Sequence, residues 1–231
     1  MTKDAQEQAK IRRYETPVEL PRILRRDGSI YAIYKPAGLP VHPGTPGVPS
    51  LKSWLDEHLD EDVSPVHRLD APVSGLVLCA DDRETRKMLA KLFESRDLTK
   101  TYFALVHGRC RRKGIIRKVL KDQRRQRTMD AVTRYKLEEW FDRCSLVSVR
   151  PETGRKHQIR RHLHMIGHGI VGDQRYRSHK TIGVPVDRLW LHAHKLELPD
   201  GRVFECPITD RLRDHLEALK LGTNPQVPST E

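Results

Sequence analysis

Long apolar runs and paired cysteines are both missing from this chain of 231 residues. No stretch approaches the ~20 consecutive apolar residues that a membrane-spanning helix needs. The opening sequence MTKDAQEQAKIRRYE lacks the apolar core of a secretory signal. The four cysteines, at positions 79, 110, 144 and 206, form no C-x-x-C pair and no zinc-ligand spacing. These absences predict free thiols in a reducing cytoplasm, with no metal.

Acidic residues are scarce relative to basic ones. The chain has 43 Lys and Arg residues against 31 Asp and Glu residues, which gives a net charge of +12. Such an excess points first to a polyanion, because nucleic-acid phosphates favour Lys and Arg through counterion release. A membrane surface is the second choice, but the sequence has no long basic amphipathic helix of the interfacial kind.

Residues 109–127, called the basic segment below, concentrate this excess of positive charge. The segment holds ten Lys or Arg residues and a single acid, Asp122. A charge run is usually a solvated loop, but this density favours contact with phosphate. The apolar pairs at 115–116 and 119–120 indicate that part of the segment is anchored to the protein.

Strand and helix patterns mix along the chain without a regular βαβ repeat. A helix is predicted after the capping residue Ser50, and another over 82–95, with Met88, Leu89, Leu92 and Phe93 facing inward. Further helices are predicted within 153–166 and around 209–219. Strands are predicted at 29–34, 76–80, 101–107, 131–141, 144–150 and 189–198. The mixture indicates an α+β fold with a mixed, largely antiparallel sheet.

Asp70 lies in the sequence HRLD, at the mouth of the apolar run 76–80. A carboxylate at such a position often caps a turn or pairs with a neighbour such as Arg68, and these residues alone favour that interpretation. The alternative is a nucleophile or general base, held rigidly and kept ionised by a nearby cation.

Cationic and imidazole side chains crowd the sequence TGRKHQIRRHLHMIGH, residues 153–168. A solvated helix face is the usual explanation, but Ile159 and Leu163 bury one side and so restrict where the others point. Arg160 and His164, four residues apart, are neighbours on the helix surface. A metal site is disfavoured, because no acidic ligand occurs among these histidines before Asp173 and the spacing matches no zinc pattern.

Tyr102 and the loop YKPAGLPVHPG, residues 34–44, are further candidates for a binding site. Tyr102 alternates with Ala104 and Val106 on one face of its predicted strand. A strand aromatic is usually a core residue, but either face could line a pocket. The loop turns because of its Pro and Gly residues, and such a loop can approach a ligand closely.

These segments, in this order, resemble the RluA-type pseudouridine synthases, and the stretch at 153–163 resembles the TruC-like branch. The resemblance covers roughly residues 22–210. It rests on KPAGLPVHPG (35–44), HRLDAPVSGLVLCA (67–80), TKTYFALVHG (99–108), TGRKHQIRRHL (153–163) and RLWLHAHKLEL (188–198).

The resemblance implies a pseudouridine synthase fold, with helices flanking the sheet and a central RNA-binding cleft. The implied reaction isomerises uridine in ribosomal RNA or tRNA: the bond from N1 to ribose breaks and C5 bonds to the ribose instead. It needs neither a cofactor nor a metal. We expect a cytoplasmic monomer with a charged arm (1–21), one catalytic domain (22–220) and a tail (221–231).

The resemblance also assigns residue roles. Asp70 is the catalytic carboxylate, Arg160 is the arginine that pairs with it, and Tyr102 stacks on the base. The expected substrate-binding residues are Arg68 near the flipped-out nucleotide, Arg155 and His157 at the start of a phosphate-binding helix, and Leu191 as an apolar wall of the base pocket. Whether Asp70 acts as nucleophile or base stays open.

Two positions depart from the family pattern, and two other functions compete. Val73 stands where many relatives have Thr, and Tyr34 stands where Asn is usual. A non-catalytic RNA-binding or ribosome-assembly protein on the same fold would explain the net charge. It would not explain why Asp70, Tyr102 and Arg160 occur together. A metal-dependent hydrolase that uses the histidines would lose its activity to a chelator.

Overall fold

A computed structural model describes residues 19–44, 47–59, 62–122, 127–178 and 186–221. The chain forms two compact units, residues 1–97 with 204–206 and residues 98–203 with 207–231. Most of the expected arm 1–21 and tail 221–231 lies outside the described residues. The single catalytic domain expected over 22–220 spans both units and stays a prediction.

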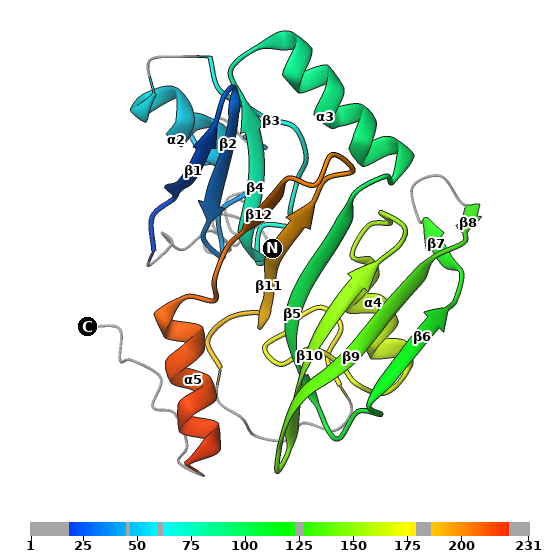
Figure 1. The fold of residues 1–231 in the computed structure, drawn as a ribbon. Helices are drawn as coiled ribbons and strands as arrows, with labels where there is room; N and C mark the ends of the chain where they lie inside the picture. Colours follow the sequence, from blue (N-terminus) through cyan, green and yellow to red (C-terminus); the bar gives the residue numbers. More distant parts are fainter. Residues whose placement is uncertain (1–18, 45–46, 60–61, 123–126, 179–185, 222–231) are drawn as a thin grey trace, which may run out of the picture. The chain divides into compact units, whose positions relative to one another are not determined.

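The first unit is built on an antiparallel sheet with strand order β1-β2-β4, and a short β3 pairs with β4 (Figure 1). Every residue of β2 and β4 is buried, which explains why both read as continuous apolar runs in the sequence. The strand bounds are β1 Arg22–Asp27, β2 Ile30–Lys35, β3 Ser64–Pro65 and β4 Ser74–Ala80; β12 (Val203–Glu205) belongs to this unit from Phe204 onward.

Two helices complete the first unit. Helix α2 (Leu51–His58) begins at Ser50, whose side chain accepts a hydrogen bond from the Ser53 amide in a capping box, as the sequence predicted. Helix α3 (Arg83–Ser95) also forms as predicted. Its buried stripe is narrower than expected, since Leu89 is fully buried while Met88 is 38% exposed. The prediction that Met88 faces inward is wrong.

The second unit contains an antiparallel sheet of order β11-β5-β10-β9-β6, and β7 pairs with β8 in a small separate sheet (Figure 1). Helix α4 (Gln158–Met165) lies against β9 and β10, and helix α5 (Asp210–Lys220) follows near the end of the chain. The strand bounds are β5 Thr99–His107, β6 Lys113–Arg117, β7 Leu120–Asp122, β8 Arg127–Met129, β9 Val132–Phe141, β10 Cys144–Pro151 and β11 Leu191–Glu197.

Helix α4 covers the sheet face that carries Tyr102. The helix is bound to Thr133 on β9, which accepts a hydrogen bond from Gln158 Nε2 at 3.0 Å. Directly opposed residues of an antiparallel pair share a face, and Tyr135 pairs with Val149, which pairs with Tyr102. Thr133 and Tyr135 are two residues apart on one strand, so they share that face too.

The basic segment forms strands rather than the solvated loop that a run of charges usually forms. It contributes β6, β7 and the start of β8. Ile116 and Leu120 are buried, whereas Ile115 and Val119 are exposed. One residue of each apolar pair therefore anchors the segment, as expected, and the other faces solvent.

The α+β class with a largely antiparallel sheet is confirmed. Within the described ranges, no helix combines the length and the apolar character that crossing a bilayer requires.

Candidate active site

Asp70 lies in a tight turn that leads into β4. The Val73 amide donates a hydrogen bond to the Asp70 carbonyl at 3.0 Å, and the Asp70 side chain is half-buried. Leu69 beside it is buried, and Arg68 is exposed. A carboxylate between a buried residue and a fully buried strand has little freedom to move, which suits a reacting group.

His67 fixes the other side of the same turn. Its Nε2 accepts a hydrogen bond from the Leu78 amide at 2.9 Å, so this nitrogen is unprotonated. The ring stacks on Phe93 of α3 at 4.2 Å between centroids. The histidine of HRLD thus ties the turn to β4 and α3, a role that the sequence analysis did not assign.

Lys35 is a second residue that the sequence analysis missed. It is fully buried at the end of β2, and its Nζ donates to the carbonyls of Pro36 (2.7 Å), Leu39 (2.7 Å) and Ala71 (3.2 Å). The Gly38 amide donates to the same Ala71 carbonyl at 2.8 Å. The 34–44 loop is therefore bonded to the residue that follows Asp70. A lysine that directly ends an apolar strand was the available signal.

A pocket of about 280 Å³ opens beside this turn, lined by Arg68, Ala71 and the proline-rich loop that contains His42. Burial, and then the charges of Arg68 and Lys52, lower the pKa of His42. A neutral imidazole can accept a hydrogen bond as well as donate one. The pocket is therefore lined by both a cation, Arg68, and a neutral hydrogen-bonding ring, His42.

In the second unit, Tyr102 and Leu191 lie on the same face of neighbouring strands. Leu191 is opposite Ala104, and Tyr102 is opposite Ala193, two residues further along. Leu191 is therefore the diagonal neighbour of Tyr102. Leu191 is buried and Tyr102 is half-buried. An aromatic ring beside an apolar side chain is an arrangement on which a nucleobase could stack.

Arg160 is buried on α4 and forms a two-pronged ion pair with Asp173. Its Nε and Nη2 donate to the two carboxylate oxygens, each at 2.8 Å. Burial alone would raise the pKa of Asp173, but the hydrogen bonds from Arg160 and the Tyr176 amide, with the Arg160 charge, hold it below its ordinary value. From the sequence alone, Asp173 is only an acid beyond the histidine cluster, because 13 residues separate it from Arg160.

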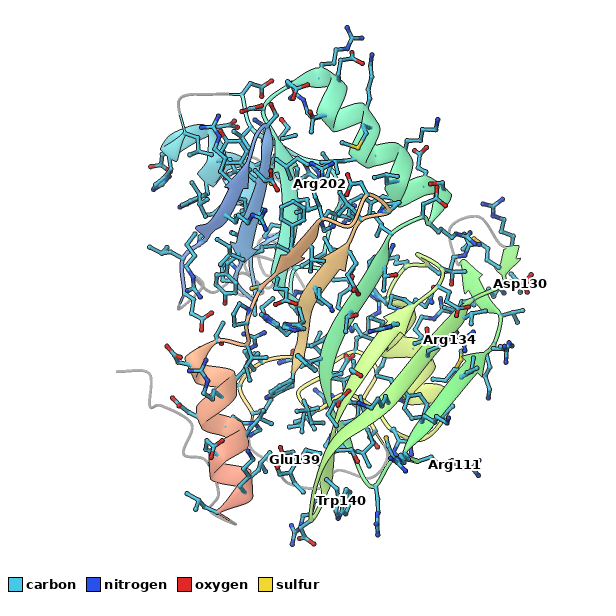
Figure 2. All side chains as sticks on the ribbon, viewed as in Figure 1. Arg111, Asp130, Arg134, Glu139, Trp140 and Arg202 are labelled. Atoms are coloured by element: carbon cyan, nitrogen blue, oxygen red, sulfur yellow. The ribbon has the colours of Figure 1, made fainter. Side chains whose placement is uncertain are left out.

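Arg155 and His157 precede α4, as expected, and each has a protein partner. Arg155 Nε donates to the Asp130 carbonyl at 3.2 Å; Asp130 follows β8 (Figure 2). His157 has a left-handed backbone, with φ of 54°, and its Nδ1 lies 2.9 Å from the Tyr176 hydroxyl. Both side chains are only half-buried, so binding of RNA by them stays a prediction.

His162 connects α4 to the basic segment. Its Nε2 lies 3.0 Å from the Lys118 carbonyl, which can only accept, so Nε2 carries the proton. Its Nδ1 lies 2.9 Å from the Thr133 hydroxyl and accepts from it. Desolvation by burial is the main cause that lowers the pKa of His162. Among the described residues, no three His, Cys, Asp or Glu side chains gather as metal ligands do.

The basic segment gathers eight described cations within a short stretch of the chain. All eight that the structure describes are exposed, and none forms an ion pair with a carboxylate whose side chain the structure describes. Elsewhere some exposed cations do pair, as in Arg213–Asp210 and Lys87–Glu84. The eight are Arg109, Arg111, Arg112, Lys113, Arg117, Lys118, Lys121 and Arg127; Figure 2 labels Arg111.

The family profile described as RNA pseudouridylate synthase matches residues 29–165. The chain belongs to the RluA-type RNA pseudouridine synthases. It is therefore an isomerase that converts uridine in RNA to pseudouridine. The matched region contains Asp70, Tyr102 and Arg160; the individual roles of these residues, and the pairing of Asp70 with Arg160, stay predictions.

Curated relatives support the same assignment. A protein of Haemophilus ducreyi named tRNA pseudouridine synthase C is 35% identical over 79% of this chain and 87% of its own length. A protein of Pasteurella multocida with the same name is 34% identical over 82% and 87%. The solved structure of Human RNA Pseudouridylate Synthase Domain Containing 4 has a TM-score of 0.73, with 23% identity over 94% of this chain and 96% of that chain. This structural likeness confirms the fold.

Proposed function

We propose that this enzyme isomerises a uridine of tRNA, with Asp70 as the catalytic carboxylate. The choice of tRNA rests on the relatives named tRNA pseudouridine synthase C, which are 31–35% identical over most of the chain. Ribosomal RNA is the alternative substrate. We further infer a cytoplasmic monomer.

The reaction rearranges bonds without a net change in composition. The bond between N1 and C1′ breaks, the uracil turns, and C5 bonds to C1′. The proton on C5 is then lost to solvent, and N1 gains a proton. Asp70 acts either as a nucleophile, on C1′ or on the uracil ring, or as the base that removes a ribose proton.

The other side chains bind and orient the nucleotide. A base inside a helix is out of reach, so the target is flipped out or already in a loop. Tyr102 stacks on the uracil, and Leu191 forms an apolar wall of the pocket that holds the base. Arg160 is the arginine that the family resemblance pairs with the Asp70 carboxylate. Arg68, beside the 280 Å³ pocket, contacts the strand next to the target.

Phosphates on either side are held by positive charge outside the catalytic centre. Arg155, before α4, is one source, and the neighbouring His157 ring adds a hydrogen-bonding group. The eight described cations of the basic segment are the second, since exposed cations attract a polyanion strongly where no carboxylate side chain that the structure describes pairs with them.

The proposal is tested by tritium release from RNA transcripts labelled at C5 of uridine, because isomerisation transfers that label to water. Unmodified tRNA transcripts should release label, and unmodified ribosomal RNA transcripts should not. Release from ribosomal RNA alone would contradict the choice of tRNA. Binding of both RNAs without release from either would favour the non-catalytic RNA-binding alternative.

A further inference from the structure

Arg160 is held on one edge of its guanidinium group. The two hydrogen bonds to Asp173 use Nε and Nη2, and the side chains of the two residues are 7% and 0% exposed. A planar fork bonded to both oxygens of a carboxylate has a fixed plane and direction. The opposite edge of the guanidinium, with its remaining N–H donors, is thereby aimed in one direction.

Asp173 is itself fixed by the backbone around it. Its Oδ1 accepts hydrogen bonds from the amides of Arg175 (2.9 Å) and Tyr176 (3.0 Å), and its own amide donates to Ile170. Ile170 forms a β-bridge with Val106 of β5. Asp173 therefore links Arg160 to the strand that carries Tyr102.

The turn before Asp173 is packed too closely to shift. Gly172 has a φ of 77°, and a Cβ added there would lie 1.9 Å from the Arg188 carbonyl oxygen. The Trp190 amide donates to the Val171 carbonyl at 2.9 Å. The segment that enters β11, and so reaches Leu191, is bonded to the same turn.

An aromatic ring covers the guanidinium. The Tyr176 ring centroid lies 5.2 Å from the Arg160 Cζ, within the range of a cation–π contact. The Tyr176 hydroxyl is 2.9 Å from His157 Nδ1. Three parts of the unit thus restrain one side chain: the turn at Asp173, the ring of Tyr176, and helix α4.

Stability alone is a weak reason for such an arrangement. Burying two charges is costly, and apolar residues of similar volume often stabilise a protein as well or better. A buried ion pair does give a side chain a single orientation. Arg160 is the member of this cluster to which the proposed function gives a role in the reaction.

We propose that Asp173, with the Tyr176 ring, is a positioning residue for the isomerisation, holding the Arg160 guanidinium in the orientation in which it acts. The inference rests on the proposed role of Arg160. Misplacing a reacting group by about 1 Å can cost roughly 100-fold in rate. Asp173→Asn keeps the shape and the bonds to the backbone amides but removes the charge that fixes the guanidinium.

The experiment measures kcat, KM and the dissociation constant for RNA, using whichever transcript the unaltered protein modifies. For Asp173→Asn we expect kcat to fall roughly 10- to 100-fold while KM and RNA affinity change less than about twofold. Arg160→Lys should lower kcat similarly, and the double variant should be no slower than the slower single variant. Asp200→Asn, which breaks an exposed arginine pair in the same unit, should change nothing.

A folded Asp173→Asn protein with unchanged kcat would overturn the proposal. So would parallel loss of RNA binding and activity, which indicates a merely structural role. Should Asp173→Asn not fold, Tyr176→Leu provides the second test, with a smaller fall in kcat expected and an unchanged kcat contradicting the inference. Full activity in Arg160→Lys would instead refute the proposed role of Arg160. If the unaltered protein released tritium from none of the RNAs, the proposed function would be refuted as well.

Discussion

Arg160 and the cations of the basic segment have the same charge in opposite surroundings. Arg160 is buried, bonded at both prongs and covered by a ring. The basic segment presents eight exposed cations with no carboxylate partner among the side chains that the structure describes. A buried and paired guanidinium has one fixed orientation. Exposed and unpaired cations instead produce an electrostatic field that acts over about 10 Å. The comparison predicts that Arg160 governs the chemical step and the basic segment governs RNA binding.

Removing the buried guanidinium should have the largest effect. In Arg160→Met, Asp173 is left buried without its cation, which should cost about 3–5 kcal/mol of stability. We expect the single-turnover rate to fall roughly 100- to 1,000-fold. Arg117→Met, on exposed β6, should change stability by less than about 0.5 kcal/mol. Chemical denaturation and rapid-quench kinetics measure both. Similar losses in the two variants would contradict the comparison.

Neutralising the basic segment should have an intermediate effect, confined to binding. Replacing Arg111, Arg112, Lys113 and Arg117 together by Gln should weaken RNA binding. The salt dependence of log Kd should become shallower by about 0.7–0.9 for each phosphate that the variant no longer neutralises. The rate at saturating RNA should not change.

The matched control also removes four positive charges, but at positions where the cations are ion-paired. Replacing Lys87, Arg202, Arg213 and Lys220 by Gln gives the same net charge. Filter-binding titrations from low to high salt should show a much smaller effect for this control. Equal weakening in both proteins would mean that net charge alone, and not the basic segment, attracts the RNA.

Loss of His162, which connects α4 to the basic segment, should have the smallest effect. It should be visible in how the free energy of unfolding depends on pH. His162 is neutral when it bonds both Thr133 and Lys118, and its folded-state pKa lies below the ordinary value of about 6.5. The unfolded chain therefore binds more protons, so the contribution is complete above about pH 6.5 and is lost as the pH falls toward the folded-state pKa.

Urea denaturation between about pH 5 and 8 tests this sign. The free energy of unfolding should fall on the acid side, and His162→Gln should lower it by about 1 kcal/mol at neutral pH while flattening the acid decline. Part of the acid decline in stability should remain in the variant, because the pKa values of His42 and His107 are also lowered. A stability that increases below about pH 6.5 would contradict the neutral assignment of His162.

Regular patterns made most of the fold predictable from sequence. The apolar runs of β2 and β4 and the alternation in β5 identified strands, and the Ser50 cap marked α2. The strands β6–β8 escaped prediction because cations interrupt their alternation and because pairing with β9 is not local. The exposure of Met88 also depends on packing, which periodicity does not reveal.

A residue of the candidate site could be predicted from the sequence where it lies within a motif of the family. Asp70, Tyr102 and Arg160 each lie in a stretch that matches the family. Asp173 and Tyr176 do not, because their contact with Arg160 depends on how the chain returns to α4 after the helix ends. Lys35 stands inside a motif, but only its burial against three carbonyls shows what it binds.

The most direct test of the account is tritium release from tRNA transcripts by Asp70→Asn, compared with Asp81→Asn. These two carboxylates stand just before and just after β4, and Asp81 pairs with Arg26 and Tyr31. We predict that Asp70→Asn binds RNA normally but releases label at least roughly 1,000-fold more slowly than the unaltered protein, while Asp81→Asn keeps its activity. Undiminished release by a folded Asp70→Asn protein would contradict the central claim that Asp70 is the catalytic carboxylate.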